Sequence, residues 1–184
     1  MTTVVVVDAG DLGDATVHGS DLGAQRLTLL RERHDDDTLI GGPGADSYIV
    51  DNTGDTVIES AKQGSDTVSS SVSFTLPDNV ENLSLTGSAA INAAGNSRAN
   101  VITGNAGSNQ LTGGGANDTF VFNTALNAAT NVDTITDFSH AAADKIELDD
   151  AIFKALAPAG AGHHIASQNF FASSDGHAHA AADR

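Results

Sequence analysis

Acidic residues recur at a fixed interval in the first part of the chain. Asp37, Asp46 and Asp55 lie nine residues apart, and each is followed two places later by an apolar residue. Aspartate supplies a hard, charged oxygen, which suits Ca²⁺ with its six to eight oxygen ligands. Glycines crowd the segment before Asp46, where they let backbones approach closely and turn carbonyl oxygens toward a cation. These glycines are Gly41, Gly42 and Gly44, in the stretch GGPGADSYI. The pattern predicts a calcium-binding turn.

A second block keeps the same period with weaker chemistry. Gly95, Gly104 and Gly113 recur every nine residues, and the position that holds Asp46 in the first block is filled here by Asn100, Asn109 and Asp118. Asparagine offers a neutral oxygen, and Ala116 stands where the fourth position would hold glycine. We therefore expect one or two calcium sites near residues 37–55 and one near residues 113–118, including Gly113, Gly115 and Asp118. The remaining turns are expected to be held by asparagine hydrogen bonds and apolar stacking.

The spacing also predicts the elements that position these residues. The stretch GGPGADSYI fits the nonapeptide G-G-x-G-x-D-x-U-x, a known β-solenoid repeat in which U is a large apolar residue. That residue lies in a very short strand and faces the interior, and one repeat cannot bury it alone, so repeats must stack. Nine residues form half a coil of eighteen. Asp37 is expected to stack over Asp55 along one edge and Asn100 over Asp118, with Asp46 and Asn109 on the opposite edge. Gly64 lies eighteen residues after Asp46, so Asp66 fits the ladder only through a two-residue slip.

These motifs resemble the RTX, or haemolysin-type calcium-binding, repeat family, and most closely the C-terminal β-roll domain of serralysin-type secreted proteins. The resemblance covers about residues 35–155 and is carried by DDTLIGGPGADSYIVDNTGDTVIE, NVENLSLTG, GNSRANVITGNAGSNQLTGGGANDTFVF and VDTITDFSHAAADKIELDDAIF. It implies an all-β, right-handed parallel β-roll (a β-solenoid), Ca²⁺ as the bound ion, an extracellular location, and export by type I machinery. In related domains the D-x-I-x-D-F segment closes the roll and its acids help to bind calcium, which adds Asp133 and Asp137. An ordinary edge strand with solvated acids is the alternative for this segment.

Three regions follow from the pattern. Residues 1–34 show no repeat and stay unassigned, and Ala24–Arg33 fits either a helix or a strand. Residues 35–156 form the roll, closed by a short capping helix that begins at Asp149-Asp150 and buries Ile152, Phe153 and Leu156. Residues 157–184 form a tail rich in Ala, Gly and His, expected to be flexible or truncated.

Composition narrows the function. Eight basic and 24 acidic residues give a formal net charge of −16, a field that repels nucleic acid. Self-repulsion also opposes compaction until cations neutralise the turns, so calcium binding should be coupled to folding. The chain has no cysteine and therefore no disulfide, and no apolar run approaches the length of a membrane span.

Catalytic signatures are missing from the sequence. There is no H-E-x-x-H, no G-x-S-x-G and no cysteine nucleophile, which predicts a non-catalytic module, compatible with a fragment of a secreted hydrolase such as a metalloprotease. The histidines of the tail have the donor type for zinc or nickel, but the Ala-rich context favours a disordered stretch. They are His163, His164, His177 and His179. The prediction is calcium-dependent folding of a secreted protein's C-terminal module, and the alternative is a structural or adhesive extracellular spacer with mostly vestigial calcium sites.

Overall fold

A computed structural model describes residues 4–8, 16–18, 26–30, 36–61, 64–125, 127, 129–149 and 152. The chain divides into two compact units, residues 1–147 and 148–184, and the strands lie almost entirely in the first. Every regular element within the described ranges is a β-strand. The all-β prediction is therefore confirmed.

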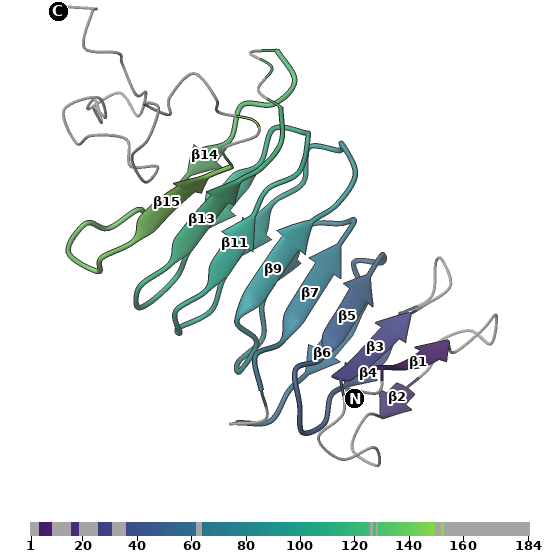
Figure 1. The fold of residues 1–184 in the computed structure, drawn as a ribbon. Coiled ribbons are helices and arrows are strands. Elements are labelled where there is room, and N and C mark those ends of the chain that lie inside the picture. The colour runs from purple at the N-terminus through teal and green to yellow at the C-terminus, as the bar shows by residue number, and fades with distance from the viewer. Residues whose placement is uncertain are drawn as a thin grey trace, which may run out of the picture. The chain divides into compact units, whose positions relative to one another are not determined.

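The largest sheet contains every odd-numbered strand, in the order β1-β3-β5-β7-β9-β11-β13-β15. Figure 1 shows its labelled strands lying side by side. The recorded pairings between its strands are parallel, as in β5 with β7 and β11 with β13. The bounds are β1 Val4–Asp8, β3 Arg26–Leu30, β5 Ser47–Val50, β7 Thr67–Ser70, β9 Asn82–Leu85, β11 Val101–Thr103, β13 Thr119–Phe122 and β15 Lys145–Leu148.

The even-numbered strands form two smaller parallel sheets. Three of them pair in the order β2-β4-β6 and four in the order β14-β12-β10-β8. The chain thus alternates between a strand of the large sheet and a strand of a small one, which is the definition of a β-solenoid coil. The bounds are β2 Thr16–His18, β4 Thr38–Ile40, β6 Thr56–Ile58, β8 Phe74–Thr75, β10 Ala93–Ala94, β12 Gln110–Thr112 and β14 Thr134–Ile135. The predicted parallel β-solenoid is confirmed.

The apolar position of each repeat faces the interior, as predicted. Leu39 pairs with Val57, and Ile102 pairs with Phe120, in adjacent coils. Burial of a large apolar side chain contributes about 1.5–3 kcal/mol, so each of these residues stabilises the contact between its coil and the next. The six repeat positions, all 0–3% exposed, are Leu39, Tyr48, Val57, Ile102, Leu111 and Phe120.

The stacking of the polar position agrees with the prediction inside each block and differs between blocks. The Asp37 backbone N–H donates to Asp55 Oδ1 over 3.1 Å, and the Asn100 N–H donates to Asp118 Oδ1 over 2.9 Å. Asp46, however, lies on the large-sheet edge with Asn100, not on the small-sheet edge with Asn109. The expected grouping of Asp46 with Asn109 was wrong, because three complete coils, of 20, 15 and 19 residues, bring the chain from the start of β5 back to the same sheet at β11.

The solenoid continues on the N-terminal side of the recognisable repeats. Strand β1 pairs with β3, β3 with β5, and β2 with β4, all in parallel. The ambiguous segment Ala24–Arg33 therefore contains a strand, β3. At the other end most of the predicted capping helix, with Phe153 and Leu156, lies outside the described residues, as does the tail from residue 157. Ile152, expected to be buried, lies in a turn and is 39% exposed.

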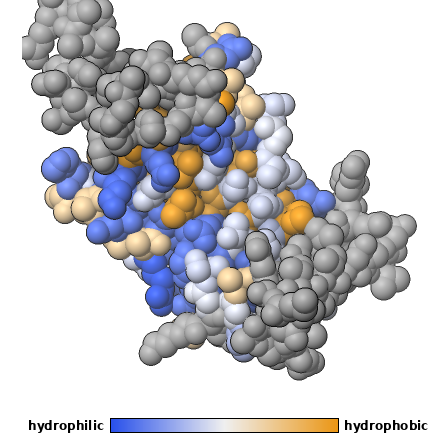
Figure 2. All heavy atoms as spheres, in the orientation of Figure 1, coloured by the Kyte–Doolittle hydropathy of each residue, from blue (hydrophilic) through white to orange (hydrophobic). Residues whose placement is uncertain are grey.

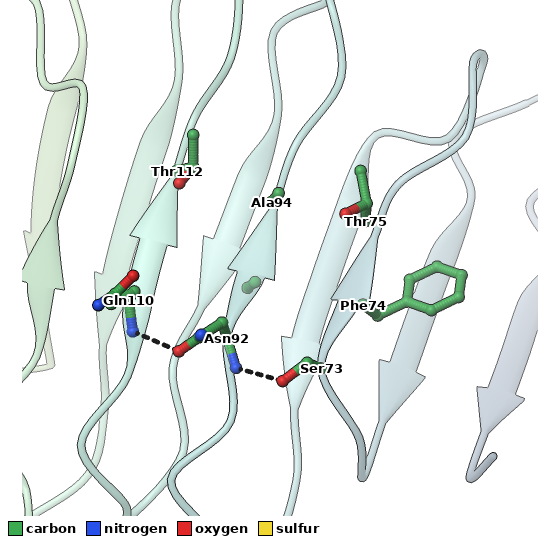
Figure 3. Close-up of a pocket in the computed structure, with 8 residues that line it drawn as sticks. Ser73, Phe74, Thr75, Asn92, Ala94, Gln110 and Thr112 are labelled. Atoms are coloured by element: carbon green, nitrogen blue, oxygen red, sulfur yellow. Dashed lines mark hydrogen bonds between the residues drawn. The ribbon is translucent and has the colours of Figure 1, made fainter. Parts of the chain in front are cut away.

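The outer surface of the coils is mixed in character. In the orientation of Figure 1, hydrophobic residues gather in a band across the described part, with hydrophilic residues on either side (Figure 2). On the outer side of β8, β10 and β12 lies a shallow groove of about 180 Å³. There the Asn92 N–H donates to Ser73 Oγ and the Gln110 N–H to Asn92 Oδ1, both over 3.0 Å (Figure 3). None of the residues that line this groove is charged.

Candidate cation site

Three carboxylates converge where two coils of the N-terminal half meet. Asp46 directly precedes β5, Asp66 directly precedes β7, and Glu59 directly follows β6. One carboxylate oxygen from each lies within 4.8 Å of the others. Calcium binds oxygens at 2.3–2.6 Å, so oxygens on opposite sides of one ion are separated by about 4.6–5.2 Å. The spacing fits a single shared Ca²⁺.

Backbone and side-chain hydrogen bonds fix this arrangement. The Gly42 N–H donates to Asp46 Oδ2 over 2.9 Å, and the Asp46 N–H donates to Asp66 Oδ1 over 2.7 Å. The Tyr48 hydroxyl donates to Glu59 Oε2. Two coils and the segment after β6 are therefore joined at one point.

Glycine at position 41 makes space for this cluster. A Cβ on Gly41 would overlap the Tyr48 hydroxyl and Glu59 Oε2, and would lie 3.0 Å from Asp46 Oδ2. Glycine is needed at the fourth position for a different reason: Gly44 adopts a positive φ of +138°, which a residue with a Cβ rarely adopts. Ala116 keeps a positive φ of +69° at the matching position of the second block, a conformation that is strained for a residue with a Cβ.

Burial dominates the electrostatics of the cluster. Asp46, Glu59 and Asp66 are 2%, 7% and 1% exposed. Burial, and then the nearby carboxylates of Glu59, Asp46 and Glu81, raise the pKa of Asp66 to about 7 against the hydrogen bond from Asp46. Burial raises the pKa of Glu59 as well, with Asp46 and Glu81 adding to it. The pKa of Tyr48 is raised by burial and by Glu59. Negative charge is disfavoured at this point unless a cation compensates it.

Asp66 also holds an oxygen that no hydrogen bond satisfies. Its Oδ1 accepts from Asp46, whereas its Oδ2 is buried without a hydrogen-bond partner. A buried carboxylate oxygen in this state is costly. It lies in the group of residues whose oxygens converge, which gives the cluster a ligand position in addition to its charge.

The other predicted acids of the first block lie on the small-sheet edge. Asp37 and Asp55 precede β4 and β6 and are 1% and 7% exposed. Besides its bond from Asp37, Asp55 accepts through Oδ2 from the N–H groups of Asp51 and Asn52 over 3.1 and 3.2 Å. These acids are therefore tied into the turn and stand apart from the Asp46 cluster.

The predicted residues of the second block lie in the three turns that precede β11, β12 and β13. Asn100 and Asn109 precede β11 and β12, and their amides bond to neighbouring coils. In the turn that leads to Asp118, the Gly115 N–H donates to Asn96 O over 2.9 Å. The pKa of Asp118 is raised by burial and by Asp144 and Asp137.

The D-x-I-x-D-F segment forms an edge strand whose acids accept backbone hydrogen bonds. Strand β14 ends its sheet. Asp133 Oδ1 accepts from the Asn109 N–H over 2.8 Å, and Asp137 accepts from the N–H groups of Gly113 and Gly114 over 2.8 and 2.7 Å. Burial raises the pKa of Asp133. These acids are engaged with the protein and are not merely solvated, and calcium binding by them stays a prediction.

Sequence reasoning missed Glu59 and the role of Tyr48. The register pairs Ile40 with Ile58, so Glu59 occupies the position that Gly41 holds one coil earlier. The sequence contains one indication of this residue, because Glu59 is an acid at a position where the repeat has glycine. Asp66 was expected to join the ladder only if the coil were two residues longer than eighteen. The pairing of Ser47 with Thr67, 20 residues apart, shows this longer coil.

The chain is thus a parallel β-solenoid with a buried acidic cluster suited to a metal ion. Its sequence is similar to the endo-1,3-1,4-β-glycanase ExsH of Rhizobium meliloti, with 42% identity over 74 residues. The match covers 40% of this chain and 16% of that protein. No protein-family model matches the chain, and no solved structure matches it significantly. In the described part, no helix is long and apolar enough to cross a membrane.

Proposed function

We propose that this solenoid is a calcium-binding module whose folding depends on the ion. The observation that carries the proposal is the buried group Asp46, Glu59 and Asp66, with an Asp66 oxygen that has no hydrogen-bond partner. Three buried carboxylates disfavour the folded state when all are ionised. A divalent cation that binds them in the folded chain only would stabilise that chain by mass action.

Calcium suits this group better than the alternatives among biological ions. All donors are hard oxygens, which argues against zinc or copper sites built on histidine or thiolate. Magnesium requires octahedral geometry at 2.0–2.1 Å and keeps several waters, which a buried group of three carboxylates does not favour.

The partial match to a glycanase supports a place for this solenoid in a larger extracellular protein. The chain matches 16% of ExsH, so the relative contains much that this chain does not match. We propose that the solenoid is a non-catalytic module of a secreted protein and that extracellular calcium fills the site after export. Whether its parent acts on a β-glycan is a question for the parent, because the match spans only 16% of the glycanase.

A structural spacer with vestigial calcium sites is the second candidate. It is favoured by the second block, where asparagine amides close the turns by themselves. The two candidates differ in one measurable property, which is whether the chain binds calcium at all.

Isothermal titration of the calcium-free chain with CaCl₂, with MgCl₂ as control, tests the proposal. We expect saturable Ca²⁺ binding that Asp66→Asn weakens, because the substitution removes a charged ligand and keeps the side-chain shape. Asp78→Asn is the matched control, since Asp78 is an exposed turn residue and the charge change is the same. A chain that shows no calcium heat and an unchanged far-UV circular dichroism spectrum contradicts the proposal and favours the spacer.

A further inference from the structure

The turns of the second block are closed by amide groups from asparagine. On the large-sheet edge, Asn100 Nδ2 donates to Val80 O and Glu81 O over 3.1 and 3.2 Å. Its Oδ1 accepts from the Asn96 N–H over 2.8 Å. Asn96 Nδ2 in turn donates to Pro77 O and Val80 O over 2.7 and 2.8 Å. The carbonyl oxygens of one coil are thus held by the next coil without an ion.

The small-sheet edge repeats the same construction. Asn105 Nδ2 donates to Thr86 O and Ala89 O over 2.9 and 3.0 Å, and Asn109 Nδ2 donates to Ile91 O over 2.7 Å. Asn109 Oδ1 accepts from the Asn105 N–H over 2.9 Å. Asn105 and Asn109 are each 2% exposed. Buried, well-partnered amides at both edges show that this is a regular feature of the block.

The acidic turn keeps half of this construction. Asp46 Oδ2 accepts from the Gly42 N–H, as Asn100 Oδ1 accepts from the Asn96 N–H. A carboxylate has no N–H to donate, however, and Gly42 has no side chain where Asn96 has an amide. The acidic turn instead brings Asp46 together with Glu59 and with Asp66, whose Oδ2 is buried without a hydrogen-bond partner, and a cation bound by these three carboxylates would offset their charge.

We propose that the two blocks differ in how they fold. The asparagine block, residues 77–112, forms its coils without a cation. The acidic block, residues 36–61, is added to it only when a cation binds. This inference rests on the proposed function, because it assigns the calcium requirement to one part of the solenoid.

The junction between the blocks supports this division. Strand β7 pairs with β9, and Asn82 donates through its backbone N–H and its Nδ2 to Asp66 O, over 3.0 and 2.9 Å. The Asp66 N–H donates to Glu81 Oε2 over 2.9 Å. Asp66 is therefore held by the asparagine block. The next coil must bring Asp46 against Asp66, and in a stack of coils each junction contributes its own interaction free energy.

Hydrogen exchange with mass spectrometry on the full chain tests the proposal, in calcium-free buffer and with saturating CaCl₂. We expect peptides that cover β9 and β11 to be protected in both conditions. Peptides that cover β4, β5 and β6 should exchange more slowly with calcium than without it, by a factor of about ten or more. The boundary should fall between Asp46 and Asp66.

Two other patterns overturn the proposal and are distinguishable. If both blocks gain protection together as calcium is added, the division between blocks is wrong, and the calcium-binding function stands. If calcium changes protection in neither block, and titration shows no binding, the proposed function fails and takes this inference with it.

The substitution Asn100→Asp makes an asparagine-closed turn resemble an acidic turn. Asn100→Asp removes the two donated hydrogen bonds and puts a second carboxylate beside Asp118, so protection of β11 should become calcium-dependent. Asn92→Asp is the matched control, because Asn92 is exposed and uses its Oδ1 as an acceptor, which aspartate keeps. Equal behaviour of the two variants contradicts the proposed role of the amides.

Discussion

Asp66→Asn is expected to stabilise the folded form of the acidic block in the calcium-free protein at pH 8, where the wild-type block requires a cation to fold. Burial and neighbouring carboxylates raise the pKa of Asp66 to about 7 in the folded chain, from an ordinary value of 3.8. Because the folded pKa is the higher one, the folded state binds more protons than the unfolded state between these two values. The stability of the wild-type protein should therefore rise as the pH falls from 8 toward 4.

The magnitude follows from the same two values. The difference between them corresponds to about 4 kcal/mol at 1.36 kcal/mol per pH unit, and this full penalty applies above pH 7. At pH 5 the penalty is about 2 kcal/mol, since the folded carboxyl is then protonated and the unfolded one is not. Asp66 alone should thus add about 2–3 kcal/mol of stability between pH 8 and pH 5. Glu59 has a raised pKa too, which steepens the slope in the same direction.

Asparagine removes the charge and keeps the acceptor that receives the Asp46 N–H. In the variant an NH2 group takes the place of Asp66 Oδ2. If this group is buried without an acceptor, it offsets the gain in stability by about 1–3 kcal/mol. We expect a net increase in stability at pH 8 that disappears toward pH 5. Guanidinium denaturation of metal-free protein at pH 5, 6, 7 and 8, followed by circular dichroism, measures it. Asp78→Asn keeps Asp66 and should therefore follow the wild-type protein at each pH.

Calcium should reverse the order of stability. The wild-type protein gains stability with the ion by RT ln(1 + [L]/Kd), whereas Asp66→Asn lacks one charged ligand and gains less. A variant that is less stable than wild type at pH 8 without calcium refutes the reasoning about burial. A variant that gains as much from calcium as wild type refutes Asp66 as a ligand.

Two further substitutions test the core and the space around the cluster. Ile102→Ala should destabilise the protein by about 2–5 kcal/mol, because Ile102 is fully buried. In the same denaturation experiment Val101→Ala, on the exposed side of β11, should have a much smaller effect. Gly41→Ala should abolish calcium binding in a titration, because its Cβ would overlap the Tyr48 hydroxyl and Glu59. Gly87→Ala meets no atom within 4 Å and is strained only by its φ of +76°, so calcium binding should survive it. Normal binding by the position-41 variant would show that this gap is not needed.

The fold could be predicted because period, residue type and burial agree at each repeat. Glycine and an acid or amide at fixed slots, followed by one apolar residue, leave few structures other than stacked coils. The interior positions Leu39, Ile102 and Phe120 follow directly from that spacing. Strands β1 to β3 lack these slots, so sequence reasoning had no means of adding them to the stack.

The site was harder to predict because it depends on coils of unequal length. Asp46 and Asp66 are 20 residues apart, while Thr67 pairs with Asn82 only 15 residues later. A fixed period of eighteen therefore misses the acid that completes the cluster. Glu59 breaks the repeat pattern altogether, and only its pairing one coil after Gly41 shows that it points into the same place.

The two blocks meet one physical requirement in two ways. Each coil leaves polar groups at its turns, and these must be satisfied as the next coil packs on them. An asparagine amide does this permanently, since donor and acceptor come from one uncharged side chain. A carboxylate does it conditionally, because it repels its neighbours until an ion arrives. The choice between Asn and Asp at a single slot therefore decides how much of a solenoid responds to calcium. In this chain the slot is acidic before residue 67, holds Asn100 and Asn109 in the second block, and is acidic again at Asp118 and Asp133. A solenoid of this mixed kind would change its length of ordered coil with calcium, while a template of asparagine-closed coils persists without it.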